Sequence, residues 1–223
     1  MVDLSQAQIF KRPPEFISWF NQVLKAINDD PSNKKNALTH AGPFKKFYEE
    51  IFPLATLLKI KGQEWKDSEF RNVFGSQSYD VEVRNHSLRY FEIVCADFDD
   101  GERFRMLTLL ERKSVDALGK ITRDADGRAD GIEQEGSMRL HTEVVEEKLV
   151  LIESRIRRKL ANSYPEKTAL IVYFDETTIE LTPNDYAKFS RCLRNLRPEW
   201  RRVFVAVYIF GPSAKHCIED SAI

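Results

Sequence analysis

The sequence is poor in the features that mark secreted, membrane-spanning and disulfide-rich proteins. Its 223 residues include only three cysteines, which are far apart and form no Cys-x-x-Cys pair. This pattern excludes a disulfide framework and favours reduced thiols. No apolar run approaches the roughly 20 residues that a membrane helix needs, and the N-terminal stretch MVDLSQAQIFKRPPEF lacks the apolar core of a signal peptide. We therefore expect a soluble, cytoplasmic protein with no membrane partner.

A strong net charge and several common catalytic motifs are absent as well. The net charge is −1, from 34 basic and 35 acidic residues, so there is no overall signature of a nucleic-acid or acidic ligand. No Gly-x-Ser-x-Gly, Gly-x-Gly-x-x-Gly or Walker-type loop is present, which leaves the serine-hydrolase, dinucleotide and nucleotide-kinase classes without support. The four histidines have no zinc spacing, and the stretch DADGRADGIEQEGS has Ser137 where a calcium loop needs a glutamate.

The apolar residues follow two periods, one typical of helices and one typical of strands. Helices are expected at Glu15 to Ile27, from Phe44 onward, along the stripe Val145 to Leu160, and after the cap residue Thr182. Strands are expected in a hairpin around RNHSLR, at Thr168 to Phe174 and at Val203 to Phe210. Continuous apolar strands separated by helices indicate parallel pairing with both faces covered. The sequence predicts an α/β fold with a mixed central sheet, in which the hairpin is followed by helix, strand, helix and strand.

The length suits a single α/β domain over residues 1–223. Within it, residues 1–60 form an N-terminal helical part, and residues 97–140 form a charged insertion or a flexible loop. The polar stretch Gly119 to Gly136 inside that insertion is either a loop or a pair of extra strands.

The predicted hairpin gathers three carboxylates, Asp80, Glu82 and Glu92. Residues two apart in a strand share a face, so these side chains lie together if the apolar faces of both strands join one core. Like charges across a strand pair repel each other, and they need solvent, a proton or a cation. An all-oxygen site of this kind suits Mg²⁺ or Mn²⁺. The alternative is a hairpin face that is simply solvated.

A helical N-terminal region, an Asp on one hairpin strand, a Glu on the next, and a helix leading to a buried strand together resemble the PD-(D/E)xK, restriction-endonuclease-like superfamily. The resemblance covers roughly residues 44–174. It implies that Asp80, Glu92 and the main-chain carbonyl of Ile93 hold Mg²⁺ or Mn²⁺. It also implies an acid from the preceding helix, for which the candidates are Glu49, Glu50 and Glu64.

The sequence departs from the family pattern at Val94, which stands in the place of the motif lysine. Some members of the superfamily carry this lysine on the following helix, where Lys148 is the candidate for the catalytic role beside Asp80 and Glu92. In the same helix Arg155, Arg157 and Arg158 are candidates for contacts with nucleic acid. The resemblance thus implies a magnesium-dependent nuclease that acts on DNA. The sequence does not determine the oligomeric state, and a homodimer is one alternative.

Val94 keeps a second hypothesis open, because a valine cannot stabilise developing negative charge. In that case the chain is a non-catalytic α/β module that binds or regulates a partner, since one fold supports many functions. A third hypothesis is a structural protein in which the solvated hairpin face has no chemical role.

Overall fold

The computed structural model describes residues 3–38, 40–96, 120–126, 128–133, 140–174, 181–213 and 216–221. Its centre is a six-stranded sheet with the order β1-β2-β3-β6-β7-β8. The strands are β1 (Glu69–Asn72), β2 (Val81–Arg84), β3 (Tyr90–Cys95), β6 (Thr168–Tyr173), β7 (Ala206–Phe210) and β8 (Cys217–Ser221). Strands β1 to β3 form an antiparallel meander, β3, β6 and β7 run parallel, and β8 is antiparallel to β7. The α/β fold with a mixed sheet is confirmed.

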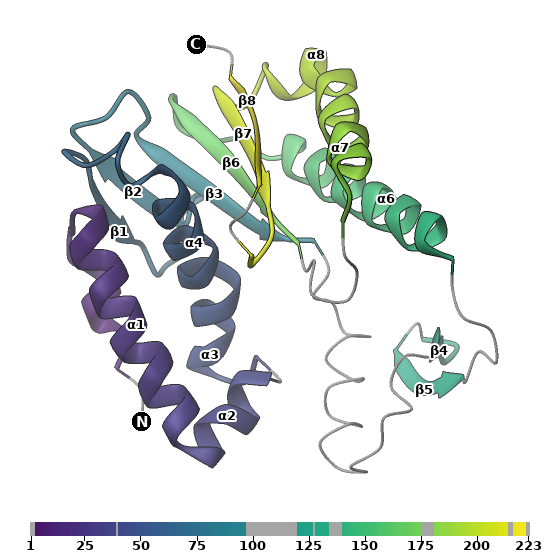
Figure 1. Ribbon diagram of the computed structural model, residues 1–223, viewed down its shortest axis with the longest axis horizontal. Helices are drawn as coiled ribbons and strands as arrows, with labels where there is room; N and C mark the ends of the chain where they lie inside the picture. Colours follow the sequence, from purple (N-terminus) through teal and green to yellow (C-terminus); the bar gives the residue numbers. More distant parts are fainter. Residues whose placement is uncertain are drawn as a thin grey trace.

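Helices cover both faces of this sheet (Figure 1). The N-terminal half contributes η1 (Ser5–Gln8), α1 (Pro13–Asp29), α2 (Pro31–Leu38), α3 (Pro43–Lys46), η2 (Phe47–Ile51) and α4 (Phe52–Lys61). The opposite face is covered by α6 (His141–Leu160), α7 (Pro183–Asn195) and α8 (Arg197–Trp200). Helix α7 begins as expected, with Thr182 as the cap residue. No described helix is long and apolar enough to cross a membrane.

The two faces of β3 are buried in two different cores. Phe91 and Ile93 belong to the core under the N-terminal helices, together with Phe20 from α1. Val94 belongs to the core under α6, together with Ile152. Because side chains alternate across a strand, Glu92 lies on the same face as Val94, toward α6. The hairpin therefore does not have one apolar and one solvated face.

An irregular helical turn precedes α4. The π-helical turn η2 runs over Phe47–Ile51 and leads into α4, whose second residue is Pro53. Proline has no N–H to donate, so the carbonyl of Glu49, four residues earlier, cannot accept the usual helical hydrogen bond. The thiol of Cys95 on β3 lies 3.6 Å from that carbonyl instead. This turn carries Glu49 and Glu50, and π-helical turns often occur at functional sites.

The predicted insertion contains a small second sheet. Strands β4 (Lys120–Arg123) and β5 (Ala129–Glu133) pair antiparallel, with a register irregularity at Arg123. Extra strands within Gly119 to Gly136, one of the two alternatives from the sequence, are therefore confirmed. The rest of the expected charged insertion, at 97–119, 127 and 134–139, lies outside the described residues.

Candidate functional site

The loop between β1 and β2 positions Asp80. The side-chain amide of Gln77 donates hydrogen bonds to the carbonyls of Val73, at 2.6 Å, and Tyr79, at 2.9 Å, and so closes the loop on itself. The N–H of Asp80 then donates to the carbonyl of Phe91 at 2.9 Å. Its carboxylate accepts a hydrogen bond from the N–H of Ile93 at 2.8 Å. Asp80 is therefore fixed against β3 by its main chain and its side chain.

Glu92 lies one residue away from this contact, on the face of β3 that α6 covers. The residue is only 7% exposed. Its carboxylate accepts a hydrogen bond from the ammonium of Lys159, which comes from the last turn of α6. A solvated hairpin face, the alternative from the sequence, does not hold at Glu92, because α6 covers it.

Glu50 brings a third carboxyl group to Asp80. One of its oxygens, Oε1, lies 3.6 Å from the ammonium of Lys46. The other, Oε2, is buried without a hydrogen-bond partner among the described residues. Burial and the nearby charge of Asp80 raise the pKa of Glu50 to about 7. We refer to Glu50, Asp80 and Glu92 as the carboxyl cluster.

Of the three acids proposed for the helical contribution, Glu50 is thus the one next to Asp80 with an unpartnered oxygen. Glu49 lies 3.3 Å from the Nδ1 of His40. Glu64 lies 2.9 Å from the ammonium of Lys61 and is well exposed. Glu82, the third acid of the hairpin, accepts a hydrogen bond from Arg71 Nε at 2.8 Å, so its charge is compensated across the strand pair.

The electrostatics of the carboxyl cluster are those of a crowded, poorly hydrated site. Burial and the charge of Asp80 raise the pKa of Glu92 to about 7, against the lowering effect of Lys159. Burial also raises the pKa of Asp80, although the N–H of Ile93 and the ammonium groups of Lys159 and Lys46 oppose this. Near neutral pH the cluster therefore retains protons, because its carboxylates repel each other and lack water.

The donor chemistry of the cluster suits a hard divalent cation. Carboxylate oxygens are preferred ligands of Mg²⁺ and Mn²⁺, and Glu50 Oε2 is a buried acceptor without a donor. The N–H of Ile93 points to Asp80, and the carbonyl of the same residue projects to the same edge of the strand. Among the described residues, however, no three His, Cys, Asp or Glu side chains are already arranged around a metal position. The residues fit the ion by their chemistry, and the side chains would have to converge on it.

Lys148 and Val94 are both buried. The ammonium of Lys148 lies 6.0 Å from the ring centroid of Phe174, just past β6. Leu170 is the residue of β6 that pairs with Glu92, and Phe174 is four residues farther, roughly 13 Å along the strand. The lysine that reaches Glu92 is Lys159, three helical turns after Lys148. Val94 is 6% exposed in the core under α6.

The three arginines of α6 lie in different environments. Arg155 is half-buried, and its Nε donates to the carbonyl of Ala96 at 3.2 Å, at the end of β3. Arg157 forms an ion pair with Glu153 at 3.0 Å, and it also contacts Glu199. Arg158 is exposed. Among the described residues, these contacts lie outside the carboxyl cluster, and the proposed role of the three arginines in binding nucleic acid stays a prediction.

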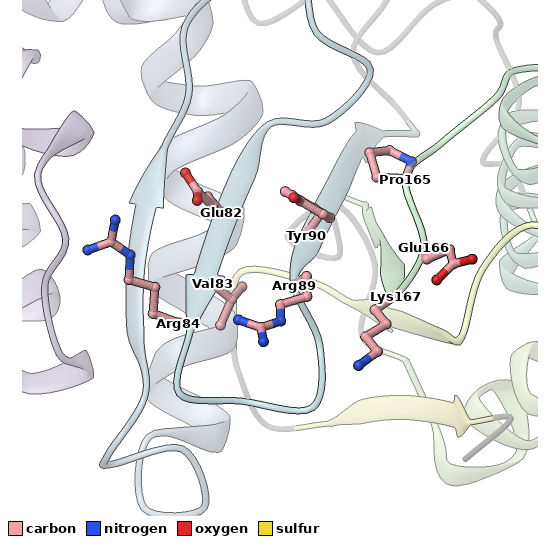
Figure 2. A pocket seen from close by; sticks show the side chains of 8 residues that line it. All are labelled: Glu82, Val83, Arg84, Arg89, Tyr90, Pro165, Glu166 and Lys167. Atoms are coloured by element: carbon pink, nitrogen blue, oxygen red, sulfur yellow. The ribbon is translucent and has the colours of Figure 1, made fainter.

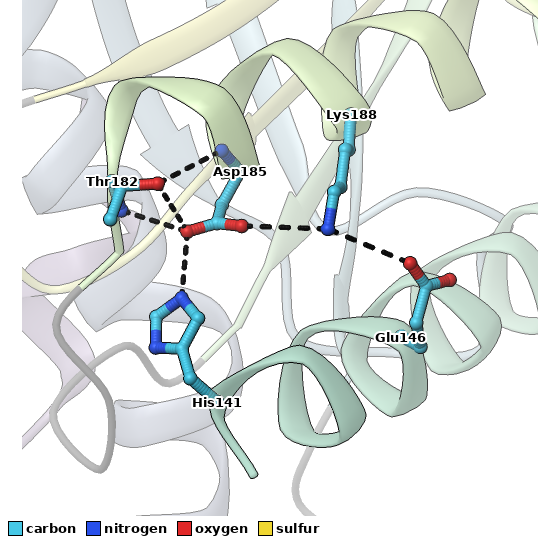
Figure 3. A network of polar contacts seen from close by, with 5 residues as sticks. All are labelled: His141, Glu146, Thr182, Asp185 and Lys188. Carbon is cyan, nitrogen blue, oxygen red and sulfur yellow. Dashed lines mark hydrogen bonds and ion pairs between the residues drawn. The ribbon is translucent and has the colours of Figure 1, made fainter.

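A second polar network joins the starts of α6 and α7 (Figure 3). Asp185 Oδ2 accepts hydrogen bonds from the Thr182 hydroxyl at 2.6 Å and from the Thr182 N–H at 3.0 Å, and it lies 2.9 Å from His141 Nε2. Lys188 lies 3.7 Å from Asp185 Oδ1 and 3.7 Å from Glu146. The hydroxyl is directed to the carboxylate and not to the imidazole, so this is a helix cap joined to a neighbouring helix. It is not a nucleophile with its base.

Two residues of the site, Lys159 and Tyr164, were not found from the sequence. Burial raises the pKa of Tyr164 to about 12, and the charges of Glu92 and Asp80 contribute to this shift. Both residues lie at or just after the C-terminal end of α6, the helix that connects β3 to β6. In a parallel crossover the end of the helix lies near the start of the next strand. This position was the sequence signal for both residues.

No protein-family model matches the sequence, and comparisons with curated proteins and with solved structures give no match. The function is therefore argued from the carboxyl cluster and its surroundings.

Proposed function

We propose that this chain is a metal-dependent nuclease of the restriction-endonuclease-like class, with its active site at the carboxyl cluster. The observation that carries the proposal is that the ammonium of Lys159 donates a hydrogen bond to Glu92, while Asp80 lies close enough to Glu92 and Glu50 to raise the pKa of both. Asp80 directly precedes β2, Glu92 lies in β3, and Lys159 lies on the helix that leads to β6. This is the order of elements that the resemblance implies, with the lysine moved to the helix.

Asp80, Glu92 and the carbonyl of Ile93 are the groups that would hold Mg²⁺ or Mn²⁺. When bound, such an ion provides positive charge that polarises a phosphodiester and makes water more acidic. The raised pKa values of the cluster support this role, since a cation relieves the repulsion that protons now relieve.

The chain's own residues have two further roles in the proposal. Lys159 opposes the rise in the pKa of Glu92 and places positive charge beside the position where negative charge develops on phosphate. Glu50, whose pKa is about 7, is able to accept a proton from water at neutral pH. Its free oxygen Oε2 is the acceptor for that proton.

The second candidate is a non-catalytic module that binds or regulates a partner. The position of Val94 favours it, because this residue is buried in an apolar core where the family carries a lysine. In this case Lys159 and Glu92 form a buried ion pair of structural importance.

Cleavage of labelled DNA in Mg²⁺ or Mn²⁺ separates the two candidates. The wild type is compared with Asp80→Asn, Glu92→Gln, Lys159→Met and the control Glu153→Gln, which alters a half-exposed residue of α6. The nuclease proposal requires cleavage by the wild type and the control, and its loss in the other three variants. Equal background in all five proteins, with folding intact, would support the binding module.

A further inference from the structure

The face of the sheet beside the carboxyl cluster contains a groove of about 420 Å³. Six of its lining residues carry the argument: Glu82, Arg84, Arg89, Tyr90, Glu166 and Lys167. They come from β2, from the β2–β3 hairpin and from the segment that precedes β6 (Figure 2). Tyr90 and Glu92 share a face of β3 and are about 7 Å apart along the strand. The groove therefore lies directly beside the carboxyl cluster.

We infer that this groove binds an unpaired strand of nucleic acid, with phosphates at Arg89 and Lys167 and a base on the Tyr79–Tyr90 pair. This inference extends the proposed function. It rests on that proposal only for the path of the bound strand toward Glu92. Binding in the groove itself does not require cleavage.

The charges of the groove favour a polyanion. Arg84, Arg89 and Lys167 are all exposed. The guanidinium of Arg84 lies 3.7 Å from the ring centroid of Phe10 and points away from Arg89 and Lys167 (Figure 2), so the latter two are the cations that face the groove. Of the two acids in the lining, Glu82 is paired with Arg71, and Glu166 is the remaining negative charge. A chain of phosphates is the ligand that matches separated cations along one groove.

The backbone at Lys167 gives an independent argument. Lys167 has a φ of 64°, in the left-handed region that glycine adopts more readily. Its carbonyl accepts a hydrogen bond from the N–H of Arg89 at 3.0 Å, which joins the two basic residues through their main chains. Local conformation alone would favour glycine here. A lysine in this position is explained by a use for its ammonium in the groove, since strained residues concentrate at functional sites.

Two tyrosines indicate that the strand is unpaired. The rings of Tyr79 and Tyr90 have centroids 4.4 Å apart, and both residues are partly exposed. Tyr79 directly precedes Asp80, and Tyr90 is two residues before Glu92. An aromatic platform stacks on the face of a nucleic-acid base. In a duplex this face is covered by the neighbouring base pair, so the platform favours an unpaired strand.

The test is fluorescence anisotropy in EDTA, which removes cleavage from the measurement. The probe is a labelled mixed-sequence DNA of about 12 nucleotides, within the site sizes of single-strand-binding domains, used alone and annealed to its complement. We expect the wild type to bind the single strand more tightly than the duplex. Lys167→Gly should weaken binding several-fold and reduce the salt dependence by about 0.7 in log–log slope. The melting temperature should stay equal or rise, because glycine relieves the backbone.

Tyr90→Leu provides the second arm, with an expected loss of roughly 5- to 100-fold in single-strand affinity and an unchanged salt slope. Arg89→Gln should behave as Lys167→Gly does, and the matched control Lys25→Gln, on the outer face of α1, should have no effect. The inference is overturned if the duplex binds as tightly as the single strand, or if the groove variants bind like the control. Preference for a multiply phosphorylated peptide over the DNA would also overturn it.

The outcomes also separate this inference from the proposed function. Groove-dependent binding without cleavage in Mg²⁺ or Mn²⁺ would keep the groove and reject the nuclease. Cleavage that is unchanged by Lys167→Gly, Arg89→Gln and Tyr90→Leu would keep the nuclease and reject the groove.

Discussion

The N–H of Ile93 donates a hydrogen bond to the carboxylate of Asp80 at 2.8 Å. This contact ties the end of the β1–β2 loop to the strand that carries Glu92. It also separates two properties of Asp80, because its oxygen satisfies a backbone donor and its charge contributes to the carboxyl cluster.

Substitutions at Asp80 should therefore affect stability and activity differently. Asp80→Asn keeps an oxygen acceptor for the N–H of Ile93 and removes a repelling charge, so we expect equal or higher stability and no cleavage. Asp80→Ala leaves the donor unsatisfied and should lower the free energy of unfolding by about 1–3 kcal/mol. Urea unfolding at pH 8, together with the DNA cleavage assay, measures both effects. An alanine variant as stable as the asparagine variant would contradict the role of the contact.

The position of Lys159 predicts which lysine of α6 is required. Lys159→Met should abolish cleavage, and it should cost roughly 3–5 kcal/mol of stability at pH 8 because the buried Glu92 loses its partner. Adding Glu92→Gln to this variant should restore most of the stability and none of the activity. Lys148→Met is the matched control and should cleave like the wild type. The assignment is wrong if Lys148→Met is inactive and Lys159→Met is active, provided that both variants fold.

The difference between these two lysines marks where the sequence stops being informative. Lys148 and Lys159 are eleven residues apart, about three helical turns, so they lie on nearly the same face of α6. A helical pattern cannot choose between them. The choice depends on how far α6 is shifted along β3, and the observed packing places Lys159 at Glu92. Such packing is a tertiary property that helical periodicity does not contain.

Glu50 shows a second limit of the sequence pattern. Asp80 and Glu92 were expected to meet, because strand alternation and a short hairpin place them together. Adjacent acids such as Glu49 and Glu50 point about 100° apart on a regular helix, but they lie in a π-helical turn, where that rule fails. Pro53 was the sequence signal for an irregularity, although it could not identify the acid. The strand expected from Val203 begins only at Ala206. The N–H of Val203 donates instead to the carbonyl of Trp200 in a turn.

The raised pKa of Glu50 predicts how stability depends on pH in metal-free buffer. The pKa is about 7 in the folded chain and near 4.5 when unfolded. The favourable contribution is therefore present below pH 4.5 and is lost as the pH rises through 7. The loss amounts to roughly 3 kcal/mol. Glu50→Gln should remove it, so the variant should be more stable than the wild type at pH 8 and similar to it at pH 5.

Urea unfolding in EDTA at both pH values measures this difference. Glu64→Gln is the control, because Glu64 is an exposed carboxylate paired with Lys61; this variant keeps Glu50 and should follow the wild type at both pH values. A Glu50→Gln variant that is less stable than the wild type at pH 8 would contradict the assignment of Glu50 to a crowded cluster. The wild type should also gain stability with Mg²⁺ at pH 8 more than the variant does, because the ion replaces protons at the cluster.

Asp185 should show the opposite dependence on pH. Burial raises its pKa, but the hydrogen bonds from Thr182 and His141 outweigh burial and lower the pKa to about 2. The ionised group therefore contributes stability above pH 4, and this contribution, about 2 kcal/mol, is lost as the pH falls through 2. Asp185→Asn should be less stable than the wild type at pH 7 by about this amount, and the difference should shrink on acidification.

Chemical unfolding between pH 2 and pH 7 checks this last prediction, because this range includes the unfolded and the folded pKa of Asp185. Asp29→Asn is the matched control, since Asp29 pairs with Lys25 on the surface of α1, where an ion pair contributes little. A difference between Asp185→Asn and the wild type that persists undiminished near pH 2 would mean that the network in Figure 3 stabilises the chain by packing rather than by the charge of Asp185.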